Sequence, residues 1–466
     1  MNDFTSNAGP DKPTGRRFGC LLQSMCILAV VLLVIGLGYF IWYSNASSEL
    51  DAEISKIASR GEPLWFSDFE TEPIDPEDNG AELYFQALEK MQAPSQAFLS
   101  AIEAPPAKSL GEDPVIVAEL ARNREVLDLV RQAVQKPFFR LPRDYQTHQP
   151  YNLNLHDVQA ARDLARLLQG DAQTAIVMGD QARAVEAIDL IFGLSELLRD
   201  EPITITQLVR FAIGSMAQGT LKSAAVQMDF SPQEFAVLDE RLATIESRFT
   251  LVTAMQGERA MAFTTMNHLD ENIDLLADSQ KKDARAMRFW SSRWLQPNLF
   301  ADQAFMLKVM NDVVEVVDKP GAAGSDAMQE IQLRVENAPK RFIFSRLCLP
   351  NIGQVRLVGL RYRQKFITAR LGLRVHRYFA EHGKFPASLA EITDDRLPTV
   401  PVDLFSGKPL VYKVLPDGFV IYPVGENGID DGGSMKPDYI ENVCNFEVHY
   451  PQLAPESEPS NESLKP

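Results

Sequence analysis

Residues 25–43, MCILAVVLLVIGLGYFIWY, contain no charged side chain. Together with the apolar stretch Phe18–Leu22 before them, they are long enough to cross a bilayer of about 30 Å as a helix. We therefore predict a transmembrane helix over residues 18–43. A cleaved signal peptide is the alternative, but the apolar region is long for such a peptide and no small-residue cleavage site follows it.

The residues that flank this helix predict its orientation. Arg16 and Arg17 precede it, and Tyr39, Trp42 and Tyr43 lie at its far end. Basic residues favour the cytoplasmic side and aromatic residues favour the membrane interface, so we expect residues 1–17 to form a cytoplasmic tail. The rest of the chain is then extracytoplasmic, in the periplasm of a cell with two membranes.

The net charge argues against a nucleic-acid partner. The 466-residue chain carries a formal charge of -17. Lys12, Arg16 and Arg17 against Asp3 and Asp11 give the first 43 residues +1, which leaves -18 for the remainder. Such a surface repels phosphate backbones, so we expect no nucleic acid among the partners.

Residues 44–318 have the pattern of a helical domain that begins with an amphipathic helix over residues 48–59. Asp113-Pro114 is typical of a helix start, and Ser231-Pro-Gln-Glu234 is a capping box. Two apolar stripes, within residues 158–168 and 185–198, predict a helical hairpin that is similar to a tetratricopeptide unit but lacks its Trp and Tyr positions. Because no fixed period continues through the domain, we predict an irregular helical array, whose methionines either fill the core or line a groove.

An acidic loop, residues 68–78, precedes the first helix of this array. Its segment Asp75-Pro-Glu-Asp-Asn-Gly resembles the start of a calcium loop, but the twelfth position is Gln86, where an EF-hand needs a bidentate glutamate. We therefore expect a solvated loop in which Asp78 or Asn79 caps a helix over residues 81–91.

Residues 319–326, KPGAAGSD, have the composition of a linker, and residues 327–450 then form the last unit. A long basic helix is predicted from Ile352 to His382, ended by Gly383 and followed by Pro386. In an acidic chain its basic residues favour contact with acidic groups of the same chain. Anionic lipid headgroups are the alternative.

Two strands are predicted over residues 409–415 and 418–424. Leu415-Pro-Asp-Gly418 joins them as a tight turn, in which proline fixes one φ angle and glycine can adopt a positive one. Residues 444–450 can add a third strand. Residues 451–466 are rich in Pro, Ser and Glu, so we expect a disordered tail.

The loop that follows the hairpin, residues 424–438, combines acids with glycines, which suits a backbone folded around a hard cation. Calcium prefers oxygen ligands, and side-chain oxygens are available from Asn427, Asp430, Asp431 and Asp438.

Three segments carry a family resemblance: Tyr378–Pro386, Pro401–Pro409 and Tyr422–Asp431. In this order they resemble the globular head of the major pseudopilin of type II secretion, over about residues 356–446. The resemblance implies a long helix before a small antiparallel sheet and a calcium ion in the loop after the hairpin. It also implies that the carbonyl groups of Val424 and Ile429 are calcium ligands.

The rest of the chain departs from that family. The N-terminus lacks a prepilin peptidase site, and residues 44–351 separate the membrane helix from the pseudopilin-like helix, whereas a pilus subunit joins the two as one rod. Asn427 also stands where the family has an aspartate. Assembly into a fibre is therefore not implied.

Cys348 and Cys444 are the only cysteines in the predicted exported part. A disulfide between them would fasten the C-terminal module to the start of its long helix. Two separately buried thiols are the alternative, since an oxidising compartment permits the bond without requiring it.

No catalytic motif of the common hydrolase, nucleotide-binding, metalloprotease or Cys-x-x-Cys types occurs, and the six histidines are scattered. We therefore expect a mainly α, single-pass envelope protein. It would act as a non-catalytic scaffold for a protein or peptide partner, with a calcium-binding head and a place in secretion or envelope assembly. The alternative is an envelope hydrolase whose residues meet only in three dimensions.

Overall fold

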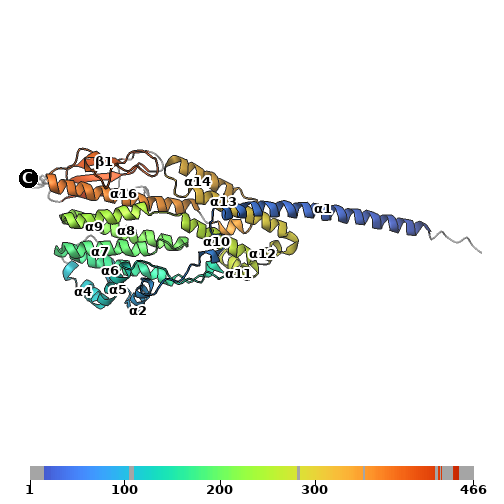
Figure 1. Ribbon diagram of the computed structural model, residues 1–466, viewed down its shortest axis with the longest axis horizontal. Coiled ribbons are helices and arrows are strands. Elements are labelled where there is room, and N and C mark those ends of the chain that lie inside the picture. Colours follow the sequence, from blue (N-terminus) through green and yellow to red (C-terminus); the bar gives the residue numbers. More distant parts are fainter. Residues whose placement is uncertain are drawn as a thin grey trace, which may run out of the picture.

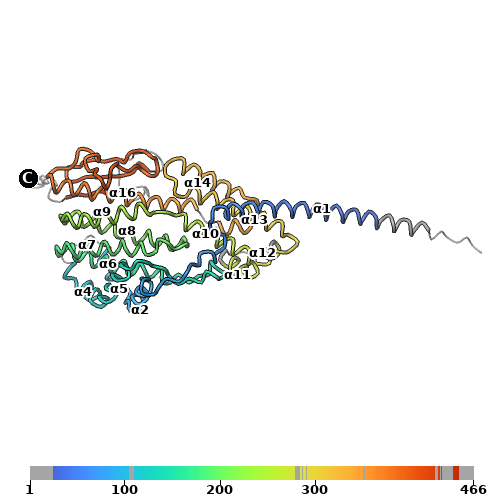
Figure 2. The backbone as a smooth tube through the Cα atoms, viewed as in Figure 1, coloured from blue at the N-terminus to red at the C-terminus, as the bar shows by residue number. Residues whose placement is uncertain are grey.

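The structure is a computed structural model that describes residues 15–103, 110–280, 284–349, 352–425, 429–430, 432 and 444–450. As expected, it is mainly helical with one small antiparallel sheet. Helix α1 extends from one end of an elongated body, and the sheet lies at the opposite end (Figures 1 and 2).

Helix α1 (Gly15–Ser59) joins the predicted membrane span and the predicted helix over residues 48–59 without a break. It is long and apolar enough to cross a membrane. Its apolar side chains from Met25 to Ile41 are mostly exposed, whereas Ala46, Leu50 and Ile57 are buried. This last part of α1 packs on α13 (Gln296–Val316), so the exposed span continues directly into the core of the body.

The body consists of helices packed in layers (Figure 1). Its other helices are α2 (Ala81–Lys90), α3 (Gln96–Glu103), α4 (Pro114–Arg122), α5 (Arg124–Val134), α6 (His156–Met178), α7 (Gln181–Leu197), α8 (Thr204–Gln227), α9 (Pro232–Ser247), α10 (Val252–Asn267), α11 (Leu269–Gln280), α12 (Ala284–Trp290), α14 (Gly321–Glu336), α15 (Ser345–Cys348) and α16 (Ile352–His382). Buried apolar residues form one cluster that extends through the body from α1 to the sheet.

The predicted helix starts are confirmed at the atomic level. Asp113 accepts hydrogen bonds from the first amides of α4, and Ser231 and Glu234 form the capping box of α9. Gly179 ends α6 with φ at 73°, and Asp180 then caps α7. The sequence therefore determines these boundaries through side-chain hydrogen bonds to the free amides of each first turn.

The prediction that residues 319–326 form a linker is wrong, because most of these residues are helical. Helix α14 begins at Gly321, directly after Pro320. Gly324 lies so close to the backbone just before the helix that a β-carbon at position 324 would meet the carbonyl oxygen of Lys319 at 2.1 Å. The small residues in this stretch therefore permit a tightly packed first turn of helix and do not mark a flexible connection.

The sheet has the strand order β1-β2-β3, with β1 (Val411–Leu415), β2 (Gly418–Tyr422) and β3 (Phe446–His449). Both pairings are antiparallel, and Leu415 faces Gly418 across the predicted turn. Helix α16 has the predicted bounds and contacts β2 and β3. The close approach requires glycine at position 372, where a β-carbon would meet the ring of Phe446 at 2.0 Å.

The other side of α16 packs on α8 and α9. Arg370 and Arg374 of α16 both contact the buried carboxylate of Asp239 on α9, with the shortest distance, 2.7 Å, between Arg374 Nη2 and Asp239 Oδ2. The expectation that basic residues of this helix meet acids of the same chain is confirmed for these two. Lys365 instead donates to the hydroxyl of Ser215.

Candidate functional site

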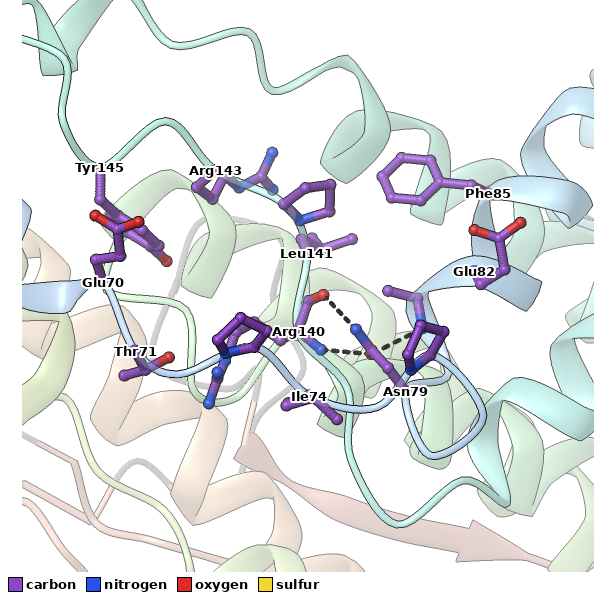
Figure 3. Close-up of a pocket in the computed structure, with 14 residues that line it drawn as sticks. Glu70, Thr71, Ile74, Asn79, Glu82, Phe85, Arg140, Leu141, Arg143 and Tyr145 are labelled. Atoms are coloured by element: carbon purple, nitrogen blue, oxygen red, sulfur yellow. Dashed lines mark hydrogen bonds between the residues drawn. The ribbon is translucent and has the colours of Figure 1, made fainter.

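A groove lies between the acidic loop before α2 and the extended segment before η3 (Pro150–Asn152), and it has a volume of about 390 Å³ (Figure 3). Its walls combine prolines, two aromatic rings and charged side chains. The lining residues are Glu70, Thr71, Pro73, Ile74, Pro76, Asn79, Ala81, Glu82, Phe85, Arg140, Leu141, Pro142, Arg143 and Tyr145.

Asn79 fixes the two walls of this groove to each other. Its side-chain Oδ1 accepts hydrogen bonds from the amides of Ala81 and Arg140, and its Nδ2 donates to the carbonyl of Arg140 at 3.1 Å. The neighbouring backbone adds a short parallel bridge between Asn79 and Phe138. The N-cap of α2 is Gly80 and not Asp78 or Asn79 as predicted, but Asn79 still bonds the first amide of the helix and also holds a segment some sixty residues away.

The segment that forms one side of the groove is acidic, and two of its acids, Glu70 and Glu82, line the groove. The loop and the start of α2 supply Asp68, Glu70, Glu72, Asp75, Glu77, Asp78 and Glu82. Opposite them, Arg140 donates to the carbonyl of Glu72 at 2.8 Å, and Lys136 donates to the carbonyl of Glu77 at 2.6 Å. These bonds draw the two basic side chains onto the acidic segment and leave its carboxylates in excess.

Arg143, at the base of the groove, is already neutralised. It contacts Asp157 at 2.9 Å and Glu201 at 3.1 Å, and all three side chains are largely buried. Burial raises the pKa of Glu201, and the charge of Arg143 opposes that shift. The guanidinium of Arg143 is therefore committed to this structural cluster.

The groove does not have the residues of a hydrolytic site. None of the lining residues is a histidine, cysteine or lysine, and the carboxylates of Glu70 and Glu82 lie towards opposite ends of it in Figure 3. The groove thus lacks the histidine, cysteine and lysine side chains that often serve as bases or nucleophiles in hydrolases.

A second group of titratable residues lies inside the body. It consists of Tyr151, Glu258 on α10, Asp302 on α13 and Cys348 on α15. Burial raises the pKa of Asp302 to about 6 and that of the Cys348 thiol to about 12. Burial also raises the pKa of the Tyr151 phenol, although 37% of this residue's surface is accessible.

The hydrogen bonds of Asp302, a member of this interior group, stabilise the fold. Asp302 accepts hydrogen bonds from the amides of Phe344 and Ser345, both at 3.0 Å, and so holds the start of α15. The charges of Asp302 and Glu258 add to burial in raising the pKa of the Cys348 thiol, which therefore stays protonated at neutral pH. A protonated thiol is a poor nucleophile, which argues against a cysteine hydrolase here.

The hypothesis of a Cys348–Cys444 disulfide is wrong, because both cysteines are free and buried. Cys444 packs against the middle of α16, where its carbonyl accepts a hydrogen bond from Thr368. Cys348 precedes the start of that helix at Ile352. The stretch from Ile352 to Thr368 spans about 24 Å at about 1.5 Å per residue, far more than a disulfide bridges.

The predicted calcium ligands are only partly described. Asn427, Asp431 and Asp438 lie outside the described residues. Asp430 Oδ1 accepts hydrogen bonds from the Tyr422 hydroxyl at 2.8 Å and from the Gly432 amide at 2.9 Å. The amide of Val424 donates to Asp403, and the side chain of Ile429 is exposed. Among the described residues, no group of three or more His, Cys, Asp or Glu is placed to hold a metal ion.

The sequence analysis missed Asp403, which organises the backbone at the base of this loop. Its buried carboxylate accepts hydrogen bonds from the amides of Phe405 and Val424 and from the hydroxyl of Ser406. One side chain thus connects the turn before β1 to the loop after β2. An aspartate followed by Leu-Phe-Ser-Gly is the local sign of such a turn, but its bond to Val424 has no sign in the sequence.

Two of the scattered histidines come together in the structure. The rings of His148 and His268 stack with 3.7 Å between their centroids. Buried Asn272 donates to the backbone carbonyls of both at 2.8 Å, and Glu271 bonds to His148 Nδ1. No sequence motif predicts this pair, because the two histidines come from distant parts of the chain.

Comparisons with protein-family models, curated proteins and solved structures find no match to this chain.

Proposed function

We propose that this protein is a single-pass membrane-anchored scaffold. Its helical body would lie outside the cytoplasm and bind an extended, basic peptide segment of a partner protein. The observation that carries this proposal is the groove between two extended segments of backbone, which has apolar walls and the carboxylates of Glu70 and Glu82 on one side. The continuity of α1 with the core supports the role of an anchor.

The chemistry of the groove favours this class of ligand. Proline and aromatic surfaces, such as Phe85 and Tyr145, can cover the aliphatic stems of Lys or Arg, while Glu70 and Glu82 offer charge complementarity to their heads. Acidic residues elsewhere on the surface would steer such a ligand towards the protein.

Peptide binding to the full-length protein in detergent tests the proposal. A short fluorescein-labelled peptide of alternating lysine and valine should bind at low salt, and an acidic peptide of equal length should not. Glu70→Gln and Glu82→Gln should each weaken binding by up to about fivefold. Glu330→Gln, at an exposed position on α14, is the matched control and should leave binding unchanged. Equal affinity of all four proteins, or equal binding of both peptides, would contradict the proposal.

The finer expectations from the sequence remain parts of the proposal. These are the tetratricopeptide-like character of the α6–α7 hairpin, the pseudopilin-like nature of the C-terminal module and the calcium ion. Positive φ angles at Gly425 (88°) and Gly432 (82°) support a tightly folded loop, and Asp430 lies within it. Val424, Ile429, Asn427, Asp431 and Asp438 would complete the ligand set.

A further inference from the structure

One segment of the body has the composition of a membrane-surface element. Residues 281–295, KKDARAMRFWSSRWL, contain five basic residues and one acid, a net charge of +4 in a chain of -17. They also contain Trp290 and Trp294, two of the four tryptophans in the chain. Basic and aromatic residues in alternation are typical of helices that lie in the interface of acidic bilayers.

The structure places this segment beside the end of the membrane span. The hydroxyl of Tyr39 on α1 donates to the carbonyl of Arg293, at 3.3 Å, in the short turn η4 (Arg293–Leu295). The ring of Tyr43 packs edge-on against Phe300 of α13 with 5.5 Å between centroids. Since Tyr39 and Tyr43 belong to the aromatic end of the span, these contacts set α12 and η4 at the depth of the membrane surface. In Figure 1, α12 lies at the end of the body from which α1 emerges.

Large apolar side chains are exposed at this level. Trp294 is 84% exposed and Phe289 is 63% exposed, whereas Met287, on the inner side of α12, is buried. Of the basic residues, Arg288 bonds to Asp274 of α11, and Arg293 is exposed. Aromatic side chains at this level can enter the interface between headgroups and acyl chains.

We propose that α12 and η4 form a second membrane contact, in which Trp294 and Phe289 enter the interface of a bilayer that contains acidic lipid. The occupant of this surface is the same bilayer that α1 crosses, because Tyr39 connects the two. With one transmembrane helix and one interfacial contact, the body would be held at a fixed tilt to the membrane. This inference rests on the proposed membrane anchor.

Tryptophan quenching in the full-length protein tests the inference. Single-tryptophan variants made by Trp→Phe replacement would retain Trp294, Trp42 or Trp65, and each would be reconstituted into liposomes with brominated phosphatidylcholine, with or without phosphatidylglycerol. Trp42 reports the span itself. Trp65 packs on Phe263 within the body, at 4.8 Å between centroids, and is the control. Circular dichroism would confirm that each variant keeps its helix content.

We expect quenching of Trp294 and Trp42 and none of Trp65. Omission of phosphatidylglycerol, or Arg293→Gln, should reduce the quenching of Trp294 alone, because one basic residue shifts such a docking equilibrium about fivefold. Quenching of Trp42 without Trp294 would overturn the second contact and leave the anchor intact. Absence of quenching at Trp42 would overturn the anchor itself. Two results together would assign the surface to self-association instead. These are an unquenched Trp294 in the single-tryptophan protein and a disulfide crosslink between two copies of a separate Trp294→Cys variant.

Discussion

Arg259 of α10 and Glu62, three residues after the end of α1, form a buried ion pair with 2.7 Å between Nη1 and Oε2. Arg259 also donates to Asn311 of α13 at 2.9 Å, and Asn311 donates to Glu53 of α1 at 3.0 Å. This network ties the C-terminal end of α1 to two helices of the body. It therefore connects the predicted membrane helix rigidly to the body.

Replacement of Arg259 should therefore weaken the whole body. Arg259→Met leaves Glu62 and Asn311 without their buried partner, and we expect the free energy of unfolding to fall by about 3 kcal/mol. Chemical unfolding in detergent, followed by circular dichroism, measures it. Arg377→Met is the control, since its pair with Glu381 is about half exposed and should contribute less than about 1 kcal/mol. Equal effects of the two changes would show that the network does not stabilise the fold.

Replacement of two helical glycines by alanine should change the free energy of unfolding in opposite directions, because only Gly372 lies in the contact between α16 and the sheet. Gly372→Ala places a methyl group against the ring of Phe446 and should cost about 1 to 3 kcal/mol. Gly219→Ala in α8 meets nothing within 4 Å and should stabilise the protein by up to about 1 kcal/mol. Thermal unfolding of both variants gives the comparison. A neutral Gly372→Ala would mean that the sheet does not pack on α16 as closely as described.

The buried carboxyl of Asp302 predicts a dependence of stability on pH. The pKa of this carboxyl is about 6 in the folded state against an ordinary value of 3.8, because burial disfavours the charged form. The folded protein therefore binds this proton more tightly than the unfolded chain does. The resulting contribution to the free energy of unfolding is fully present below about pH 4 and is lost as the pH rises through about 6. Relative to Asp302→Asn, the wild type should lose up to about 3 kcal/mol between about pH 4 and pH 7. Parallel pH profiles for the two proteins would exclude this assignment.

The proposed calcium site predicts that the ion stabilises the loop after β2. For a site with a dissociation constant of about 10⁻⁴ to 10⁻³ M, a tenfold excess of calcium stabilises by about 1.4 kcal/mol. Hydrogen exchange of β2 in the full-length protein, in calcium and in chelator, should show this protection, and Asp430→Asn should abolish it. Tyr422→Phe is the control, because it removes the hydrogen bond to Asp430 and keeps the carboxylate. Identical exchange of the wild type in both buffers would eliminate the site.

Local sequence signals predicted the ends of elements well. Helix α16 has the expected bounds, because Gly383 adopts a positive φ of 67° directly after it. The hairpin forms at Leu415-Pro-Asp-Gly418 for a similar reason. Both features depend on the backbone freedom of a few residues, which a sequence displays directly.

Contacts between distant residues were not predictable in the same way. Arg370 and Arg374 of α16 bond to Asp239 of α9. The groove is likewise formed by two distant segments, residues 70–85 and residues 140–145. Such pairings depend on how helices pack, and a single sequence does not encode them locally. The linker prediction failed for a related reason, since the glycines that suggested flexibility serve close packing at Gly324.

Labelling of two engineered cysteines in intact spheroplasts tests the anchored, extracytoplasmic scaffold most directly. Val237→Cys lies at an exposed position of α9, and Ser6→Cys lies in the N-terminal tail. A membrane-impermeant maleimide should label position 237 in intact spheroplasts and position 6 only after permeabilisation, with the labelled protein retained in the membrane fraction. Labelling of position 6 and protection of position 237, or release of the labelled body into the soluble fraction, would contradict the account.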